Sequence, residues 1–334
     1  MTQTTTSPTI RIEKTGGPEE MKLVDLPVGD PGAGEVRIRH HASGLNYIDV
    51  YQRSGVYANP MPLAMGNEGA GVIEAVGAGV THLKEGDRAA YCSGPPGSYS
   101  VARVMPAKTV VRLPDAISFE TGAAMMLKGL TTQYLLKRVR AQEALEPGDF
   151  IVWHAAAGGV GLIACQWAKA LGLKLIGTAG SEEKCALARD NGAAFTINYR
   201  TEDFAARARE LTGGRGVNVV LDHIGGRYLT ANLAALAPGG RLVEIGLMGG
   251  AAAELNLAQL LLRRLAVIGS TLRSRSNEDK AAIVEAFRAR FGAALARGVL
   301  RPVVDRVLPI EQAAEAHRLM QASEHFGKIV LRIA

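Results

Sequence analysis

The segment that most constrains the fold starts with the apolar run Phe150 to Trp153 and continues through a glycine turn into a helix-like stretch. The turn is Ala155-Ala156-Ala157-Gly158-Gly159-Val160-Gly161, residues 162–171 have helical character, and residues 173–178 form a second apolar run. Strand, glycine turn, helix and strand within about 30 residues is the context that a dinucleotide-binding fingerprint requires. The glycines allow close approach of a pyrophosphate, and the helix N-terminus offers unpaired N–H groups to it.

The same alternation continues along the chain. Further strands are predicted at 193–197, 217–222, 241–246 and 265–270, and helices are predicted near 182–191, 201–212, 227–236 and 257–264. Six strands interleaved with helices predict an α/β fold with a doubly wound parallel sheet, the Rossmann fold. An α/β domain without a nucleotide is the alternative interpretation.

The end of the second predicted strand favours NADP(H) over NAD. An NAD site usually carries Asp or Glu there, whereas this strand ends at Thr178-Ala179-Gly180-Ser181. The Ser181 hydroxyl can donate to a 2′-phosphate, and the Lys184 ammonium lies one helical turn further on. We expect Glu182 and Glu183 to cap the helix start, where negative charge is favourable. A solvated helix lysine is the alternative for Lys184.

The first third of the chain is β-rich. Between residues 9 and 108 short apolar stretches such as Val36 to Arg39 and Gly71 to Val76 alternate with glycine turns, which favours a small β-barrel. Residues 1–9 are polar and are expected to form a frayed tail without targeting function.

Composition excludes several classes of protein. The 334 residues are 47% hydrophobic and 21% charged, which excludes a disordered chain and suits about two domains of roughly 150 residues each. Three scattered cysteines cannot form a disulfide framework, and no apolar run approaches the roughly 18 residues of a membrane helix. These features predict a cytoplasmic protein that does not enter a membrane.

Four motifs carry a resemblance to a known family. They are GLNYIDVYQRSGVY at 44–57, GNEGAG at 66–71, LKGLT at 127–131 and HAAAGGVG at 154–161. Their order and spacing resemble those of the zinc-free quinone oxidoreductases, the zeta-crystallin-like branch of the medium-chain dehydrogenase/reductase superfamily. The similarity extends from about Ile10 to Arg332. Residues 246–250 and 271–275 look closer to the tumour-suppressor-inducible subgroup.

The resemblance implies a domain organisation. A GroES-like β-barrel domain would consist of residues 1–128 and be completed by 274–334, with a Rossmann domain of residues 129–273 inserted between them. The C-terminal part would contribute a helix near 278–297 and strands at 302–307 and 328–333.

Three positions argue against a metal. Zinc-dependent relatives carry Cys, His and Cys at the positions that look like Asn46, Asn67 and Leu127 in this chain. Amide and alkyl groups are poor zinc ligands, so a His/Cys tetrahedral site cannot form. Only Cys92 lies in the first 164 residues, so the four-cysteine structural lobe is also absent. We therefore expect no metal site.

Without a Lewis acid the reaction must suit an acceptor that needs little activation, such as a quinone or a conjugated carbonyl. The resemblance implies an NADPH-dependent quinone reductase in which Asn46 and Tyr51 are the catalytic residues. Tyr51 would donate a hydrogen bond to the developing oxyanion. A turn asparagine and a core tyrosine are the alternative interpretations, and Tyr57 is a weaker candidate.

The resemblance also implies a set of cofactor contacts. Lys128 and Thr131 are expected to start the helix that enters the Rossmann domain, and Lys328 is a weak substitute for the family's C-terminal basic contact. The expected cofactor-binding residues are Asn46, Lys128, Thr131, Gly158, Gly159, Val160, Gly161, Gly180, Ser181, Lys184, Tyr199, His223, Gly246, Leu247, Met248, Gly249, Ser270 and Leu272.

Two other functions stay open at this point. The same zinc-free cleft could serve an enone or enoyl reductase, including one that acts on an acyl-CoA. An RNA-binding or structural crystallin-like protein is the third interpretation, although the net charge of +6 and the short basic clusters argue against nucleic acid as a partner. The last predicted Rossmann strand would lie at the sheet edge, which predicts a homodimer through that strand.

Overall fold

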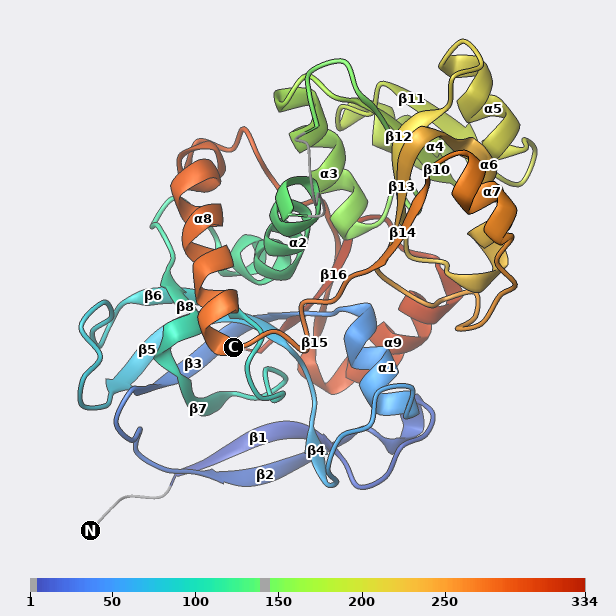
Figure 1. Ribbon diagram of the computed structural model, residues 1–334. Coiled ribbons are helices and arrows are strands. Elements are labelled where there is room, and N and C mark those ends of the chain that lie inside the picture. Colours follow the sequence, from blue (N-terminus) through green and yellow to red (C-terminus); the bar gives the residue numbers. More distant parts are fainter. Residues whose placement is uncertain (1–4, 139–144, 334) are drawn as a thin grey trace. The chain divides into compact units, whose positions relative to one another are not determined.

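The computed structural model describes residues 5–138 and 145–333 (Figure 1). The chain divides into two compact units. The first unit consists of Met1–Leu130 and Arg275–Ala334, and the second unit consists of Thr131–Ser274.

The second unit is built on a six-stranded sheet in the order β11-β10-β9-β12-β13-β14, and every neighbouring pair in it is parallel. Its strands are β9 (Phe150–Trp153), β10 (Lys174–Ala179), β11 (Phe195–Asn198), β12 (Val217–Asp222), β13 (Leu236–Glu244) and β14 (Ala266–Gly269). This order reverses between β9 and β12, as in a Rossmann fold, and the predicted doubly wound sheet is confirmed.

Helices connect these strands and cover the sheet. They are α3 (Gly159–Ala170), α4 (Glu182–Asp190), α5 (Phe204–Leu211), the 3₁₀ helix η3 (Gly226–Tyr228), α6 (Leu229–Ala235) and α7 (Leu257–Leu262). Because parallel crossovers are right-handed, the reversal of strand order places α3 and α4 on one face and α5 and α6 on the other. The central strand β9 is buried throughout, which explains its continuous apolar sequence.

The first unit is mainly antiparallel β-structure, as its alternating sequence predicted. Its strands are β1 (Thr5–Ile12), β2 (Lys22–Val28), β3 (Glu35–Gly44), β4 (Leu63–Ala64), β5 (Glu68–Val76), β6 (Arg88–Cys92), β7 (Ala102–Pro106), β8 (Val110–Arg112), β15 (Val304–Pro309) and β16 (Lys328–Arg332). The C-terminal strand β16 pairs with β3. Both ends of the chain therefore build this unit, and the GroES-like barrel architecture is confirmed.

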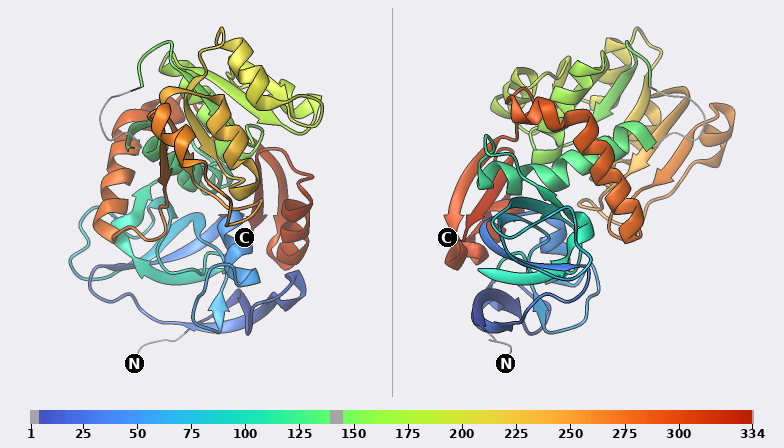
Figure 2. Two further views of the ribbon diagram at one scale, coloured as in Figure 1. Left: turned by 45° about the vertical axis from the view of Figure 1, so that its right-hand side comes forward. Right: turned by 90° about the vertical axis from the view of Figure 1, so that its left-hand side faces the viewer.

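Helices of the first unit pack around these strands. They are α1 (Tyr47–Ser54), α2 (Phe119–Arg138), α8 (Asn277–Ala296) and α9 (Ala313–Ala322), with the 3₁₀ helices η1 (Pro18–Glu20), η2 (Ala107–Thr109) and η4 (Ile310–Gln312). The part of α2 that follows Leu130 belongs to the second unit. Both views in Figure 2 show α8 running past α2. A Cβ atom placed at Gly129 would lie 2.5 Å from the Phe287 ring, so glycine permits this close packing.

Two expectations about local structure were wrong. Thr5 to Thr9 are not a frayed tail, because they belong to β1 and pair with β2; residues 1–4 lie outside the described residues. Lys128 and Thr131 do not start a helix, because α2 begins at Phe119 and both residues lie within it. Among the described helices, none has the length and apolarity to cross a bilayer.

Candidate active site

Asn46 sits at the junction of β3 and α1, as the N-cap residue of the helix. Its backbone N–H donates to the Asp49 carboxylate at 2.8 Å. Its side chain turns toward the interior instead, where Nδ2 donates to Gly44 O and to Glu68 Oε2, each at 2.9 Å. The predicted catalytic asparagine is therefore buried and fixed in orientation by its partners.

Two lysines converge on the same amide oxygen. Lys128 Nζ and Lys328 Nζ donate to Asn46 Oδ1 at 2.9 and 2.8 Å. Lys328 Nζ also lies 2.7 Å from Glu68 Oε2, and the side chains of this ion pair are 1% and 0% exposed. The other oxygen of Glu68 accepts the backbone N–H of Leu127 at 2.7 Å. We call Asn46, Glu68, Lys128 and Lys328 the lysine cluster.

The lysine cluster has unusual electrostatics because it holds two ammonium groups and one carboxylate. Burial lowers the pKa of Lys128, the nearby Lys328 ammonium lowers it further, and Glu68 and Asp49 oppose both effects. The resulting pKa of Lys128 is about 7. Lys328 is not a surface cation available to a cofactor phosphate, because its Nζ is committed to Glu68 and Asn46.

A second buried polar group lies beside the first. Asn67 donates to the carboxylate of Asp49 and to Gln52, and the Tyr99 hydroxyl donates to Asp49 at 2.9 Å. Burial raises the pKa of Asp49, although these donors oppose the shift. The Asn67 amide therefore binds two side chains of α1, and the sequence did not identify Asp49 or Gln52 as its partners.

The residues at the positions of zinc ligands in relatives form hydrogen bonds within the first unit. Asn46 Oδ1 accepts two ammonium groups, Asn67 Nδ2 donates to Asp49, and Leu127 contributes only its backbone N–H. A divalent cation would meet two positive charges and no thiolate or imidazole, so these residues do not fit zinc. No cluster of three or more His, Cys, Asp or Glu side chains suited to a metal occurs among residues 5–138 and 145–333.

Tyr51 belongs to an aromatic group on and after α1. Its ring centroid lies 5.1 Å from that of Tyr47 and 5.1 Å from that of Tyr57. The two predicted tyrosines are thus brought together. Lys128 joins Asn46 in the lysine cluster, while the remaining predicted cofactor residues belong to the second unit.

In the second unit, the turn between β9 and α3 needs glycine at one position above all. A Cβ atom placed at Gly161 would lie 2.6 Å from both Cα and O of Ala156, and because these are backbone atoms, α3 or the turn would have to move. At Gly158 the nearest atom is 3.1 Å away. The turn that leads into α3 therefore depends on glycine at position 161. Together with the N-terminus of α3 at Gly159 and Val160, this turn forms a cradle suited to a pyrophosphate.

The carboxyl end of β10 carries a cationic group. Ser181 is the N-cap of α4 and accepts the Lys184 N–H, so Ser181 and not the following glutamates caps the helix; Glu182 and Glu183 occupy the first turn. A Cβ atom at Gly180 would lie 2.6 Å from the Tyr199 hydroxyl and 3.5 Å from Arg200 Nε. The sequence reasoning missed Arg200, although its position one residue after Tyr199 was a usable signal.

The loops after β12 and β13 lie against each other. Met248 N donates to His223 O at 3.1 Å, and Gly249 N donates to Ile224 O at 2.6 Å. A Cβ atom at Gly246 would lie 2.8 Å from His223 O. The predicted residues His223, Gly246, Leu247, Met248 and Gly249 are therefore brought together at the carboxyl edge of the sheet, and Leu247 and Met248 are exposed there.

A buried network that the sequence reasoning did not assign supports this edge. His154 Nε2 lies 2.7 Å from Asn232 Oδ1 and Nδ1 lies 2.8 Å from Thr178 Oγ1. Asn232 in turn donates to Asp222, whose carboxylate also accepts two backbone N–H groups of the β12 loop. Burial lowers the pKa of His154, so the imidazole is neutral. The network ties the ends of three strands together.

The last strand adds a further pair. The Ser270 hydroxyl is hydrogen bonded to the Tyr134 hydroxyl of α2, and Ser270 N donates to Glu244 O at 2.9 Å. Burial and the Asp222 carboxylate raise the pKa of Glu244 to about 7. Leu272 is half-buried three residues after β14, and Thr131 is half-buried on α2.

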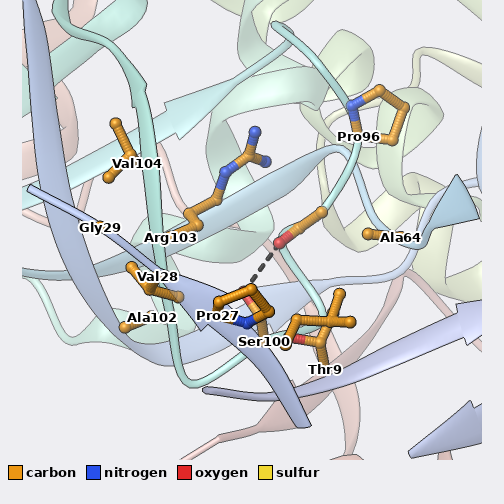
Figure 3. A pocket seen from close by; sticks show the side chains of 12 residues that line it. Thr9, Pro27, Val28, Gly29, Ala64, Pro96, Ser100, Ala102, Arg103 and Val104 are labelled. Atoms are coloured by element: carbon orange, nitrogen blue, oxygen red, sulfur yellow. Dashed lines mark hydrogen bonds between the residues drawn. The ribbon is translucent and has the colours of Figure 1, made fainter. Parts of the chain in front are cut away.

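A separate cavity of about 280 Å³ lies in the first unit near β2 and β7 (Figure 3). Its walls include Val28, Ala64, Pro96 and Arg103, and none of the predicted site residues lines it. Ser100 Oγ donates to Gly97 O at 2.8 Å, and Arg103 donates to Pro95 O at 2.9 Å. Because no residue of the candidate active site lines this cavity, the cavity is not part of that site.

Comparison with known proteins agrees with this geometry. Residues 32–115 match the family model described as alcohol dehydrogenase GroES-like domain, and residues 159–288 match the one described as zinc-binding dehydrogenase. A quinone oxidoreductase of Pseudomonas aeruginosa is 44% identical over 324 residues, which cover 96% of this chain and 98% of that protein. A 2-haloacrylate reductase of Burkholderia sp is 39% identical, covering 96% of this chain and 97% of that protein.

A solved structure extends the comparison to three dimensions. The crystal structure of Escherichia coli quinone oxidoreductase complexed with NADPH matches with a TM-score of 0.90 and 38% identity, covering 98% of this chain and all of that one. The two-unit fold, the glycine turn at Gly161 and this degree of similarity over nearly the whole chain lead to one conclusion. The chain belongs to the quinone oxidoreductase family of the medium-chain dehydrogenase/reductase superfamily.

Proposed function

We propose that this protein is an NADPH-dependent quinone oxidoreductase. The observation that carries the proposal is the glycine cradle at Gly161 in a Rossmann sheet, in a chain whose relatives include quinone oxidoreductases and one solved with NADPH. When bound, the cofactor supplies a hydride with its electron pair. The first turn of α3 and the loops after β12 and β13 would hold it, with Gly158, Gly159, Val160, His223 and residues 246–249 in contact.

NADPH in preference to NADH is supported by the end of β10. Arg200 Nε lies 3.5 Å from a Cβ atom placed at Gly180, Lys184 lies in the first turn of α4, which begins directly after Ser181, and no carboxylate stands at the tip of the strand. Ser181 and Tyr199 add hydroxyl groups that can donate to a phosphate. A charge-assisted hydrogen bond is worth about 1.5–3 kcal/mol, which is enough to discriminate a 2′-phosphate by more than about tenfold.

We further propose that the reaction needs no zinc. The lysine cluster supports this, because two ammonium groups converge on Asn46 Oδ1. Asn46 would orient the substrate side of the site through its fixed amide, and Tyr51 would donate a hydrogen bond to the oxygen on which negative charge develops. Thr131, Ser270 and Leu272 are proposed to contact the nicotinamide side of the cofactor.

A substrate panel tests this function. We expect the purified chain to oxidise NADPH with 1,4-benzoquinone, with kcat/KM for NADPH at least about tenfold above that for NADH. Lys184→Met should lower kcat/KM for NADPH and leave that for NADH unchanged, whereas Lys169→Met, at an exposed position, should change neither. Turnover of crotonyl-CoA or an enone in place of quinones would favour the enoyl or enone reductase, and equal use of NADH would reject the NADP assignment.

We also propose a homodimer formed through β14 in the cytoplasm. Among the strands that the structure describes, β14 is the end strand of its sheet and pairs with β13 alone. Near it Leu257, Leu261 and Leu262 of α7 are 67%, 76% and 77% exposed. Apolar side chains beside an end strand support pairing with a second copy. The three cysteines are buried free thiols, which suits a reducing compartment.

Light scattering tests the dimer. We expect a mass twice the 35.3 kDa of the chain at micromolar concentration. Leu261→Asp should shift the protein toward the mass of one chain, because a buried unpaired carboxylate is costly in an apolar contact. Val299→Asp, at an exposed position of the first unit, should leave the mass unchanged. A wild-type mass of one chain would reject the homodimer.

A further inference from the structure

We propose that Lys128 donates the proton that a quinone takes up during its reduction, and that the Lys328–Glu68 pair positions Lys128 for this transfer. The inference rests on the quinone reductase activity proposed above. A quinone gains one hydride, with its electron pair, and one proton to become a hydroquinone. The O–H bond forms while an Nζ–H bond of Lys128 breaks, and the resulting amine takes a proton back from water.

The two lysines of the cluster use their N–H groups differently. Lys328 Nζ donates to both Glu68 and Asn46, so it serves the interior of the unit. Lys128 Nζ donates to Asn46 alone among the described residues of its unit. Because an ammonium has three N–H groups, Lys128 retains donors for a ligand. Lys128 is 8% exposed, whereas Lys328 is 1% exposed.

The charges around Lys128 support a proton donor. Glu68 can balance only one ammonium, and at 2.7 Å it balances Lys328. Burial, and then the facing Lys328 ammonium, lower the pKa of Lys128 to about 7, although Glu68 and Asp49 oppose both effects. Burial raises the pKa of Cys92 to about 12 and also raises that of Tyr99, so these two groups near Glu68 stay neutral. A pKa near the working pH is the condition for efficient general acid catalysis.

The position of Lys128 agrees with this role. It follows Leu127, whose N–H donates to Glu68 Oε1, while Asn46 Nδ2 donates to Glu68 Oε2. The cluster thus contains Asn46 and contacts Leu127, which stand at two of the positions where zinc-dependent relatives hold their metal, although amide and alkyl groups are poor zinc ligands. A cation there can stabilise negative charge on a substrate oxygen, and an ammonium can also protonate that oxygen.

Glycine at position 44 makes this arrangement possible. A Cβ atom placed there would lie 2.7 Å from Lys328 Cε and 2.9 Å from Glu68 Oε2, and it would also collide with the Ala123 carbonyl oxygen of α2. The backbone at Gly44 therefore admits both α2, which carries Lys128, and the Lys328 side chain. The first unit is shaped to bring the two lysines to one oxygen.

A pH profile tests the proposal kinetically. With 1,4-benzoquinone and saturating NADPH, we expect kcat to be constant below pH 6 and to fall tenfold per pH unit above about pH 7, because the ammonium form is required. The Kd for NADPH, followed by fluorescence, should stay within about threefold over the same range. Lys128→Arg keeps the positive charge, but a guanidinium does not give up its proton to the substrate, so kcat should fall about 100-fold or more. Lys84→Arg, at an exposed position, is the matched control.

A second measurement does not depend on activity. In the chain labelled with ¹³C at lysine Cε and free of cofactor, one resonance should titrate near pH 7, and it should be missing in Lys128→Arg. In Lys328→Met the same resonance should titrate at higher pH, because the repulsion between the two ammonium groups is lost. If Lys328→Met does not fold, the titrations of the wild-type chain and of Lys128→Arg still show whether Lys128 titrates near pH 7.

Three results would overturn the proposal. They are the absence of any lysine titrating below pH 9, full kcat in Lys128→Arg, and a Kd for NADPH that rises in step with the loss of kcat. The last result would make Lys128 a cofactor contact only. If no quinone is reduced at any pH while the lysine titrates near pH 7, the proposed function fails and the unusual lysine remains established.

Discussion

Glu68→Gln is expected to lower the free energy of unfolding by about 3–5 kcal/mol, because it leaves the Lys328 ammonium buried without a counter-ion. Both side chains of this pair are at most 1% exposed, and their charged atoms are 2.7 Å apart. Glutamine preserves the shape of the side chain and can still accept from Leu127 N. The lowered free energy of unfolding therefore reflects the loss of the negative charge and not the creation of a cavity.

The measurement uses the distribution of tryptophan. Both tryptophans, Trp153 and Trp167, belong to the second unit, so their fluorescence follows that unit, while circular dichroism follows the whole chain. In urea, Glu68→Gln should move the transition seen by circular dichroism more than the one seen by fluorescence. Glu74→Gln is the matched control, since Glu74 pairs with Arg37 and Arg39 at a solvated site and should cost only about 0–1 kcal/mol. Equal effects of the two substitutions would show that the cluster is hydrated.

Gly161→Ala is expected to have the largest effect on the cofactor site. The added Cβ would lie 2.6 Å from Ala156 Cα and 2.7 Å from Ala155 O, so either α3 or the turn after β9 must move. Overpacking of this kind costs about 1–3 kcal/mol. A displacement near 1 Å at a binding site costs up to about 100-fold. We expect NADPH affinity, measured by fluorescence titration, to fall by at least about tenfold.

Substitutions at two other glycines serve as controls for the steric conflict at Gly161. Gly29→Ala meets no atom within 4 Å in the first unit and should leave both stability and NADPH affinity unchanged. Gly158→Ala should cost less stability than Gly161→Ala, because its contact with the Ala155 carbonyl oxygen is 3.1 Å and not 2.6–2.7 Å, and because its φ of −78° suits alanine. Normal NADPH binding by Gly161→Ala would mean that the turn does not hold the pyrophosphate.

Several features of this protein were predictable because they depend on neighbouring residues. The apolar run at 150–153 is central in its sheet and buried on both faces, and a continuous apolar sequence is what that position demands. The glycine turn that follows is equally local, since the steric conflict at Gly161 involves a residue only five positions earlier. Such local patterns determine the parallel sheet and the glycine turn at which we propose that a dinucleotide binds.

Local sequence patterns gave wrong predictions where the structure depends on residues that are distant in the chain. Residues 5–9 are polar and suggested a tail, yet they form a strand because β2 supplies their hydrogen-bond partners. Lys128 was expected at a helix start, but α2 begins nine residues earlier at Phe119. The capping preference of Ser181 was visible in its residue type, whereas the placement of Arg200 beside Gly180 required the pairing of β10 with β11.

The sequence by itself determined the fold class, the glycine cradle and the absence of thiolate and imidazole groups at the positions where relatives bind zinc. Only the tertiary structure decided what occupies the interior beside Asn46. The hydrogen bond from Lys328 to Asn46 spans 282 positions of the chain. No local pattern can reveal that Glu68 neutralises Lys328 and leaves Lys128 facing a like charge. The physical reason is that a pKa depends on burial and on charges a few ångströms away, and folding alone brings those charges together.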